Sequence, residues 1–90
     1  MKYRISDGIA LREIMGDSIL VPIGETDGFN GIFLLNPTSR IIYDGFLSGV
    51  GEEDIVNEIL SQYDATRAEV EQDVRECIAD MAAKHILVAE

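Results

Sequence analysis

The first third of the chain contains short apolar runs separated by glycine and proline, a pattern typical of short β-strands. Apolar residues at partly alternate positions predict strands over about 9–15 and 18–23, and Gly16-Asp17 between them fits a two-residue hairpin turn. A polar loop over 24–31 leads to a third apolar run over 31–35. We therefore expect a three-stranded antiparallel sheet.

The remainder of the chain has helical periodicity, with start signals for three helices. Asn36 is a good N-cap residue and Pro37 suits the first helical position, so a helix is predicted over about 37–48. Three acidic residues favour the start of a second helix over about 51–63. Thr66 and Glu69 form a capping box, which predicts a third helix over about 66–85.

Three strands followed by three helices predict an α+β fold in which the last two helices form a helix-turn-helix. Ninety residues support one modest core, so we expect a single domain over 1–90. The apolar tail Ile86-Leu87-Val88 is short enough either to pair with the sheet or to pack on it.

The charge balance disfavours two classes of partner. Seven Lys and Arg against seventeen Asp and Glu give a net charge of −10, which repels phosphate backbones and anionic lipid. We therefore expect neither nucleic acid nor a membrane as a partner, although a helix-turn-helix often binds DNA. No apolar run approaches the length of a membrane span. The single cysteine, Cys77, is consistent with the reducing cytoplasm.

Candidate catalytic residues are few. Cys77 and His85 are the only Cys/His combination, and eight helical residues separate them by roughly 12 Å, too far for a hydrogen bond. A buried cysteine and a histidine near the helix end are the simpler interpretation. Asp17-Ser18-Ile19 resembles the attachment site of an acyl carrier protein, but Ser18 leads into a β-rich segment and not into a helix. We expect no catalytic residue.

Metal binding is also disfavoured. Glu69, Asp73 and Glu76 share one helix face at spacings of four and three, but a solvated acidic face is the commoner explanation in so acidic a chain. No glycine-rich phosphate-binding motif precedes a helix. We therefore expect neither a metal site nor a cofactor.

The order of these segments resembles one known family. The hairpin, the strand Phe33-Leu34-Leu35-Asn36-Pro37, the Ile41-Ile42-Tyr43 helix, the acidic-start helix at 52–56 and the final helix over 70–87 are similar to the coenzyme PQQ synthesis protein D (PqqD) family, which coincides with the recognition element of ribosomally made, modified peptides. The resemblance covers nearly the whole chain. It implies a winged-helix domain without enzymatic activity. Such domains hold a precursor's leader peptide as a strand added to the third strand, against the third helix, and present it to a radical S-adenosylmethionine or other modifying enzyme.

The resemblance and an exposed third strand together predict where a peptide binds. An edge strand offers unpaired backbone groups, and alternate side chains give specificity. The sequence leaves open whether Ile32 and Leu34 or Phe33 and Leu35 face the core, and whether Val74 and Ile78 line the cleft or the core. The candidate peptide-binding residues are Ile32, Phe33, Leu34, Leu35, Arg67, Val70, Glu71, Val74, Arg75 and Ile78.

The expected partners are a precursor peptide and a modifying enzyme acting in trans, with the chain a monomer or weak homodimer. The alternative is a winged-helix interaction or regulatory domain that binds another protein.

Overall fold

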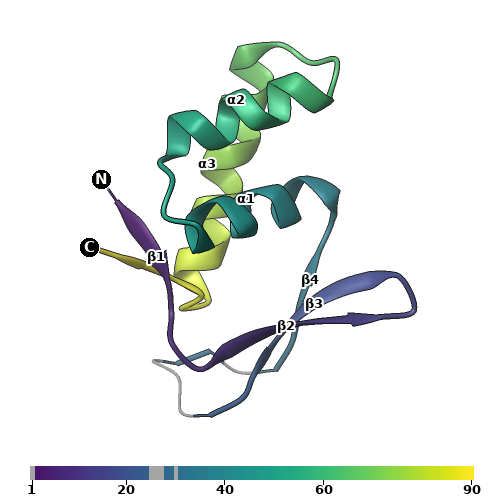
Figure 1. The fold of residues 1–90 in the computed structure, drawn as a ribbon. Helices are drawn as coiled ribbons and strands as arrows, with labels where there is room; N and C mark the ends of the chain where they lie inside the picture. Colours follow the sequence, from purple (N-terminus) through teal and green to yellow (C-terminus); the bar gives the residue numbers. More distant parts are fainter. Residues whose placement is uncertain (1, 25–27, 30) are drawn as a thin grey trace.

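The computed structural model describes residues 2–24, 28–29 and 31–90, in which five strands and three helices form (Figure 1). The strands are β1 (Tyr3–Ile5), β2 (Ile9–Ile14), β3 (Asp17–Pro22), β4 (Phe33–Leu35) and β5 (Leu87–Ala89). The helices are α1 (Pro37–Leu47), α2 (Glu52–Gln62) and α3 (Arg67–Ala83). Within these described residues, no helix is long and apolar enough to span a membrane.

Strands β2, β3 and β4 form the expected antiparallel sheet, in that order. Leu20 on the central strand lies opposite Leu11 on one side and Phe33 on the other, and its side chain is fully buried. The sheet is followed by the three helices, so the predicted α+β, winged-helix-like fold class is confirmed. β4 is shorter than the expected strand, since Gly31 and Ile32 lie outside it, and the expected loop over 24–31 falls partly outside the described residues.

The hairpin turn between β2 and β3 lies one residue earlier than expected. Its two central residues are Met15 and Gly16, with φ angles of 52° and 88°. Positive φ at both positions is the geometry of a type I′ turn, not the type II′ turn that Gly16-Asp17 suggested. The turn leaves Met15 almost completely exposed at its tip.

A second, two-stranded sheet joins the two ends of the chain. β1 pairs with β5 in antiparallel register, with Tyr3 opposite Ala89 and Ile5 opposite Leu87. Next to this sheet, the buried Ser6 hydroxyl donates a hydrogen bond of 2.6 Å to the carbonyl of His85. The apolar tail therefore pairs with a strand that the sequence did not predict, and not with the three-stranded sheet.

The starts of α1 and α3 have the capping boxes that fix their first turns. Asn36 accepts from the Ser39 amide, and Thr66 accepts from the Glu69 amide, while each partner side chain accepts from the cap's own amide. α3 ends at Ala83, two residues before the expected end, because His85 adopts a left-handed conformation with φ of 64°.

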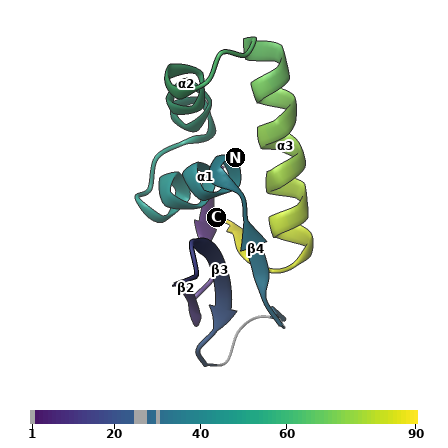
Figure 2. The ribbon, with the colours of Figure 1, turned by 90° about the vertical axis from the view of Figure 1, so that its right-hand side faces the viewer.

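The core lies where the three helices meet the sheets (Figure 2). Val74 and Met81 of α3 are fully buried, and they pack with residues of α1 and α2. Tyr3 of β1 packs edge-on against Phe46 of α1, with ring centroids 5.8 Å apart. The remaining fully buried large side chains are Leu20, Ile42, Ile55 and Ile86.

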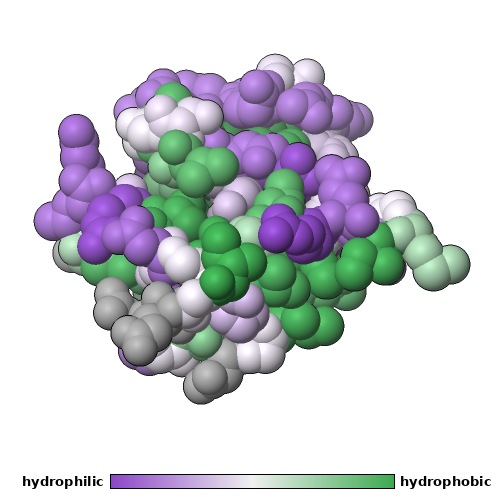
Figure 3. All heavy atoms as spheres, turned by 60° about the horizontal axis from the view of Figure 1, so that its bottom comes forward, coloured by the Kyte–Doolittle hydropathy of each residue, from purple (hydrophilic) through white to green (hydrophobic). Residues whose placement is uncertain are grey.

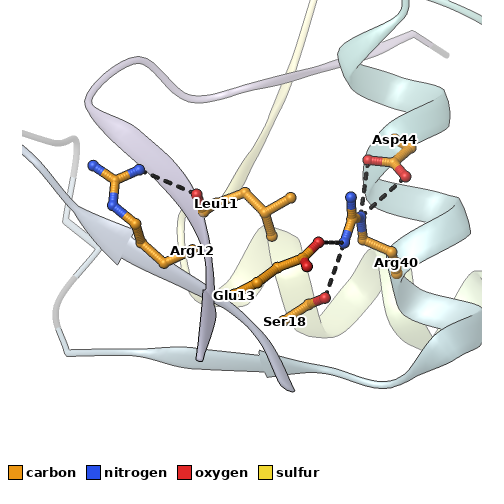
Figure 4. A network of polar contacts seen from close by, with 6 residues as sticks. All are labelled: Leu11, Arg12, Glu13, Ser18, Arg40 and Asp44. Carbon is orange, nitrogen blue, oxygen red and sulfur yellow. Dashed lines mark hydrogen bonds and ion pairs between the residues drawn. The ribbon is translucent and has the colours of Figure 1, made fainter. Parts of the chain in front are cut away.

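One arginine fixes the hairpin to the first helix (Figure 4). The Arg40 guanidinium, on α1, donates to Glu13 of β2 at 3.0 Å and to Ser18 of β3 at 2.9 Å, and it forms an ion pair with Asp44. The hydrogen bonds to Glu13 and Asp44 raise the pKa of Arg40. The hairpin therefore has a defined orientation relative to α1, next to β4.

Candidate functional site

β4 is the edge of the three-stranded sheet. It pairs with β3 on one side, and in the described part of the chain no strand pairs with its other side. The backbone donors and acceptors along that side are the groups on which another strand could add. Asn36 ends the strand and caps α1, so the edge has a fixed end and a fixed direction.

Alternate residues along β4 have opposite environments. Leu35 is only 5% exposed and Phe33 is partly buried against the core. Ile32 and Leu34 are 68% and 63% exposed. The structure therefore answers the question that the sequence left open: Phe33 and Leu35 face the core, while Ile32 and Leu34 are the outward pair.

A groove, the β4–α3 groove, separates β4 from α3. It has a volume of about 490 Å³ and lies beside the open edge, where Figure 2 shows the strand running alongside the helix. β4 and the start of α1 form one wall and the floor, and α3 forms the other wall. The lining residues are Phe33, Leu34, Asn36, Thr38, Ser39, Ile42, Asp73, Glu76, Cys77 and Asp80.

Two further surface hollows adjoin the groove. One, of about 300 Å³, shares Thr38 and Asp73 with it and extends to Tyr63 and Val70. The other lies between the hairpin turn and β4, and Leu34 lines both it and the β4–α3 groove. Leu34 is thus an exposed apolar ridge between two hollows. Figure 3 shows apolar side chains gathered over this sheet end of the molecule.

The α3 wall is a stripe of residues at helical spacing. Asp73, Glu76, Cys77 and Asp80 are separated by three, one and three residues, so they share one side of the helix. We call Asp73, Glu76 and Asp80 the acidic stripe. Asp80 forms an ion pair with Lys84, whose ammonium lies 5.5 Å from the centre of the Phe33 ring.

The helix residues expected from sequence lie elsewhere on α3. Val70, Val74 and Ile78 are at most 6% exposed and belong to the core; none of the three lines the β4–α3 groove. Arg67 and Glu71 form an ion pair, and Arg67 also donates to Asn57 of α2. Arg75 is exposed and does not line the groove. The peptide-binding assignment of these six residues stays a prediction, and the groove brings together a different set.

The sequence does not predict that one wall of a cleft is formed by four residues of α3: Asp73, Glu76, Cys77 and Asp80. Their helical spacing is visible in the sequence, where Asp73 and Glu76 share a face with Glu69 that suggests a metal site. Glu69 instead accepts from the Thr66 hydroxyl at the helix start. Among the described residues, no three potential metal ligands come together.

Cys77 lies half-buried in the α3 wall, with a thiol that is poorly ionised. Burial, together with the nearby Asp80 carboxylate, raises the pKa of Cys77 to about 11. A thiol in this state is a weak nucleophile near neutral pH. His85 lies beyond the end of α3 in a left-handed conformation. Cys77 packs against the core from its position in the groove wall.

Comparison with known proteins gives one family and two similar folds. The family model described as coenzyme PQQ synthesis protein D (PqqD) matches residues 18–87. A solved structure of TbiB1 in complex with the TbiA(beta) leader peptide is 26% identical, with a TM-score of 0.79 over 97% of this chain and 99% of that chain. A lasso peptide synthetase B1 complexed with the leader peptide shares the fold at 17% identity, with a TM-score of 0.83 over 99% of this chain and 100% of the other. No curated protein matches significantly.

Proposed function

The chain belongs to the coenzyme PQQ synthesis protein D family, and on this premise we propose that it binds the leader segment of a ribosomally synthesised precursor peptide. The leader adds as a strand to the open edge of β4 and occupies the β4–α3 groove. The observation that carries this proposal is an unpaired strand edge beside a groove of about 490 Å³.

The dimensions and chemistry of the groove suit an extended peptide. Neighbouring strands lie about 4.8 Å apart, so an added strand on β4 comes between that strand and the α3 wall. Its backbone pairs with the open edge, which gives affinity without requiring a particular sequence. Its alternate side chains contact Phe33, Ile42 and Cys77 on the groove side, while Leu34 and Ile32 offer exposed apolar surface.

The similarity to TbiB1 supports the same ligand class, since that protein was solved in complex with a leader peptide. We propose that this chain has no catalytic role of its own and presents the bound precursor in trans to a modifying enzyme, a radical S-adenosylmethionine enzyme as the family resemblance implies. The raised pKa of Cys77 is consistent with a binding protein that lacks a nucleophile in the groove.

The test is an amide chemical-shift titration of the ¹⁵N-labelled chain with the leader of a precursor encoded beside its gene. We expect the shifts to cluster on Phe33–Leu35 and on the α3 residues from Asp73 to Asp80. Leu34→Gln should weaken binding about tenfold, because it removes roughly half of the free energy of burying a leucine side chain.

Leu47→Gln is the matched control. Leu47 is as exposed as Leu34, at 61% against 63%, but lies at the end of α1 and does not line the groove. Equal weakening by both substitutions, or shifts that cluster away from β4 and α3, would contradict leader binding at this edge. The second pattern would favour a winged-helix domain that contacts another protein through a different surface.

A further inference from the structure

We propose that the β4–α3 groove selects leader segments that carry a lysine or arginine two positions from an apolar residue, through Asp73 and Glu76 of the acidic stripe. This inference rests on the proposed function, because it concerns the side chains of a peptide bound in that groove. It specifies the chemical class of the leader segment that binds in the groove.

The groove pairs an uncharged wall with a charged one. On the β4 side the lining residues are neutral, and Phe33 and Ile42 supply apolar surface. On the α3 side all the charged lining residues are acidic. The backbone of a peptide strand between the two walls therefore hydrogen-bonds to β4. The acidic α3 wall favours positively charged side chains on that strand.

None of the ion pairs among the described residues joins a lysine or arginine to Asp73 or Glu76. Lys84 is occupied by Asp80 at one end of the stripe. Arg67 pairs with Glu71, and Arg75 lies two residues from Asp73, about 200° around the helix. Glu76 accepts a hydrogen bond from Gln72, a neutral side chain that brings no positive charge to it. Asp73 and Glu76 thus leave two negative charges facing the groove.

The space next to Asp73 fits the shape of a long basic side chain. Asp73 lies where the β4–α3 groove joins the hollow that extends to Tyr63 and Val70. A lysine or arginine has an apolar stem and a charged tip. The stem can lie against Tyr63 and Thr38 while the tip reaches Asp73. An apolar residue two positions along the peptide points to the same face of the strand and contacts Ile42 and Cys77.

The experiment uses three synthetic 12-residue peptides with a common background of valine and threonine. They differ at two neighbouring positions, which are both Lys, both Gln or both Glu. Because neighbouring side chains point to opposite faces of a strand, one of the two faces α3 in either orientation. Affinities and binding sites are measured by amide chemical shifts of the whole chain, at low and high salt.

We expect the Lys peptide to bind about fivefold more tightly than the Gln peptide at low salt and the Glu peptide to bind most weakly, since partly exposed ion pairs contribute modestly and are screened by salt. The double variant Asp73→Asn/Glu76→Gln should lose this preference. Glu52→Gln/Glu53→Gln removes the same two charges from the start of α2 and should keep it.

The outcomes separate this inference from the proposed function. Equal affinity for the three peptides, with shifts on Phe33–Leu35, would refute basic selection and leave strand addition intact. A preference that survives in Asp73→Asn/Glu76→Gln would assign it to the overall charge of −10 and also refute the inference. Absence of shifts on β4 with every peptide would refute the inference, whereas the proposed function is refuted only if the leader itself causes no shifts there.

Discussion

Phe33 and Leu34 are adjacent in sequence and lie in opposite environments, one packed on the core and the other exposed as a ridge between two hollows. The sequence predicts this alternation, because side chains of a strand point to opposite faces in turn. It could not predict which face is buried, since both pairs of residues are equally apolar. That choice depends on where β3 and α1 place the strand.

Cys77 gives a test at the scale of one residue. With a pKa of about 11, the thiol should react with iodoacetamide about 100-fold more slowly at pH 8 in the folded chain than in urea, where its pKa returns to about 9. Because Cys77 is the only cysteine, mass spectrometry reads the modification of this site alone. Leader binding in the β4–α3 groove should slow the reaction further. Equal rates with and without urea would show that the thiol is neither buried nor perturbed.

The raised pKa of Cys77 also predicts how the free energy of unfolding depends on pH. The folded state holds the Cys77 proton more tightly than the unfolded state, so its contribution is complete below pH 9 and declines as the pH rises from 9 towards 11. Cys77→Ser should remove this part of the alkaline dependence.

At the scale of the element, α3 shows how far a helical pattern can predict a site. The buried stripe of Val70, Val74 and Ile78 follows from periodicity, and all three are in the core. A buried stripe has two flanks, and the sequence does not say which one meets β4. In the structure Arg67 contacts Asn57 of α2, whereas Asp73, Glu76 and Asp80 on the other flank line the groove.

The hairpin of β2 and β3 gives a test at this scale. Arg40→Ala removes the side chain that joins both strands to α1, so the amides of the hairpin should exchange with solvent faster. The loss of global stability should be at most about 1 kcal/mol, because the ion pairs are exposed. Hydrogen exchange followed by NMR, with urea unfolding, measures both quantities.

Arg12→Ala provides the control, since Arg12 lies on the same hairpin and its guanidinium donates only to the adjacent carbonyl of Leu11 (Figure 4). It removes the same charge and should leave hairpin exchange unchanged. If both variants exchange alike, Arg40 does not fix the hairpin.

At the scale of the whole molecule, the sheet of β1 and β5 was the part of the fold that sequence patterns could not predict. Each strand has three residues, too few to show alternation, and they lie at opposite ends of the chain. Their pairing depends on α3 returning the chain to its start, where Tyr3 packs on Phe46. The three-stranded sheet and the helices, by contrast, follow from local patterns and caps.

Ser6→Ala tests this closure of the molecule. The substitution leaves the His85 carbonyl without its buried hydroxyl donor and should reduce the free energy of unfolding by about 1–2 kcal/mol. Ser61→Ala removes a comparable bond to the carbonyl of Glu58 on the exposed surface of α2 and should have little effect. Urea unfolding of the two variants compares them directly. Similar losses would mean that the Ser6 hydrogen bond has no special role in joining the ends.

Because β1 and β5 are paired, the chain enters and leaves the molecule at adjacent points, whereas β4 lies at the opposite side in the view of Figure 1. A flexible linker attached at either end would therefore hold a tethered enzyme close by without covering the β4–α3 groove. Such a connection would raise the effective concentration of the enzyme around a bound peptide into the millimolar range, for a short linker, with no new contact between the two proteins. The pairing of two three-residue strands thus makes the domain equally suited to working as a free partner or as a fused module.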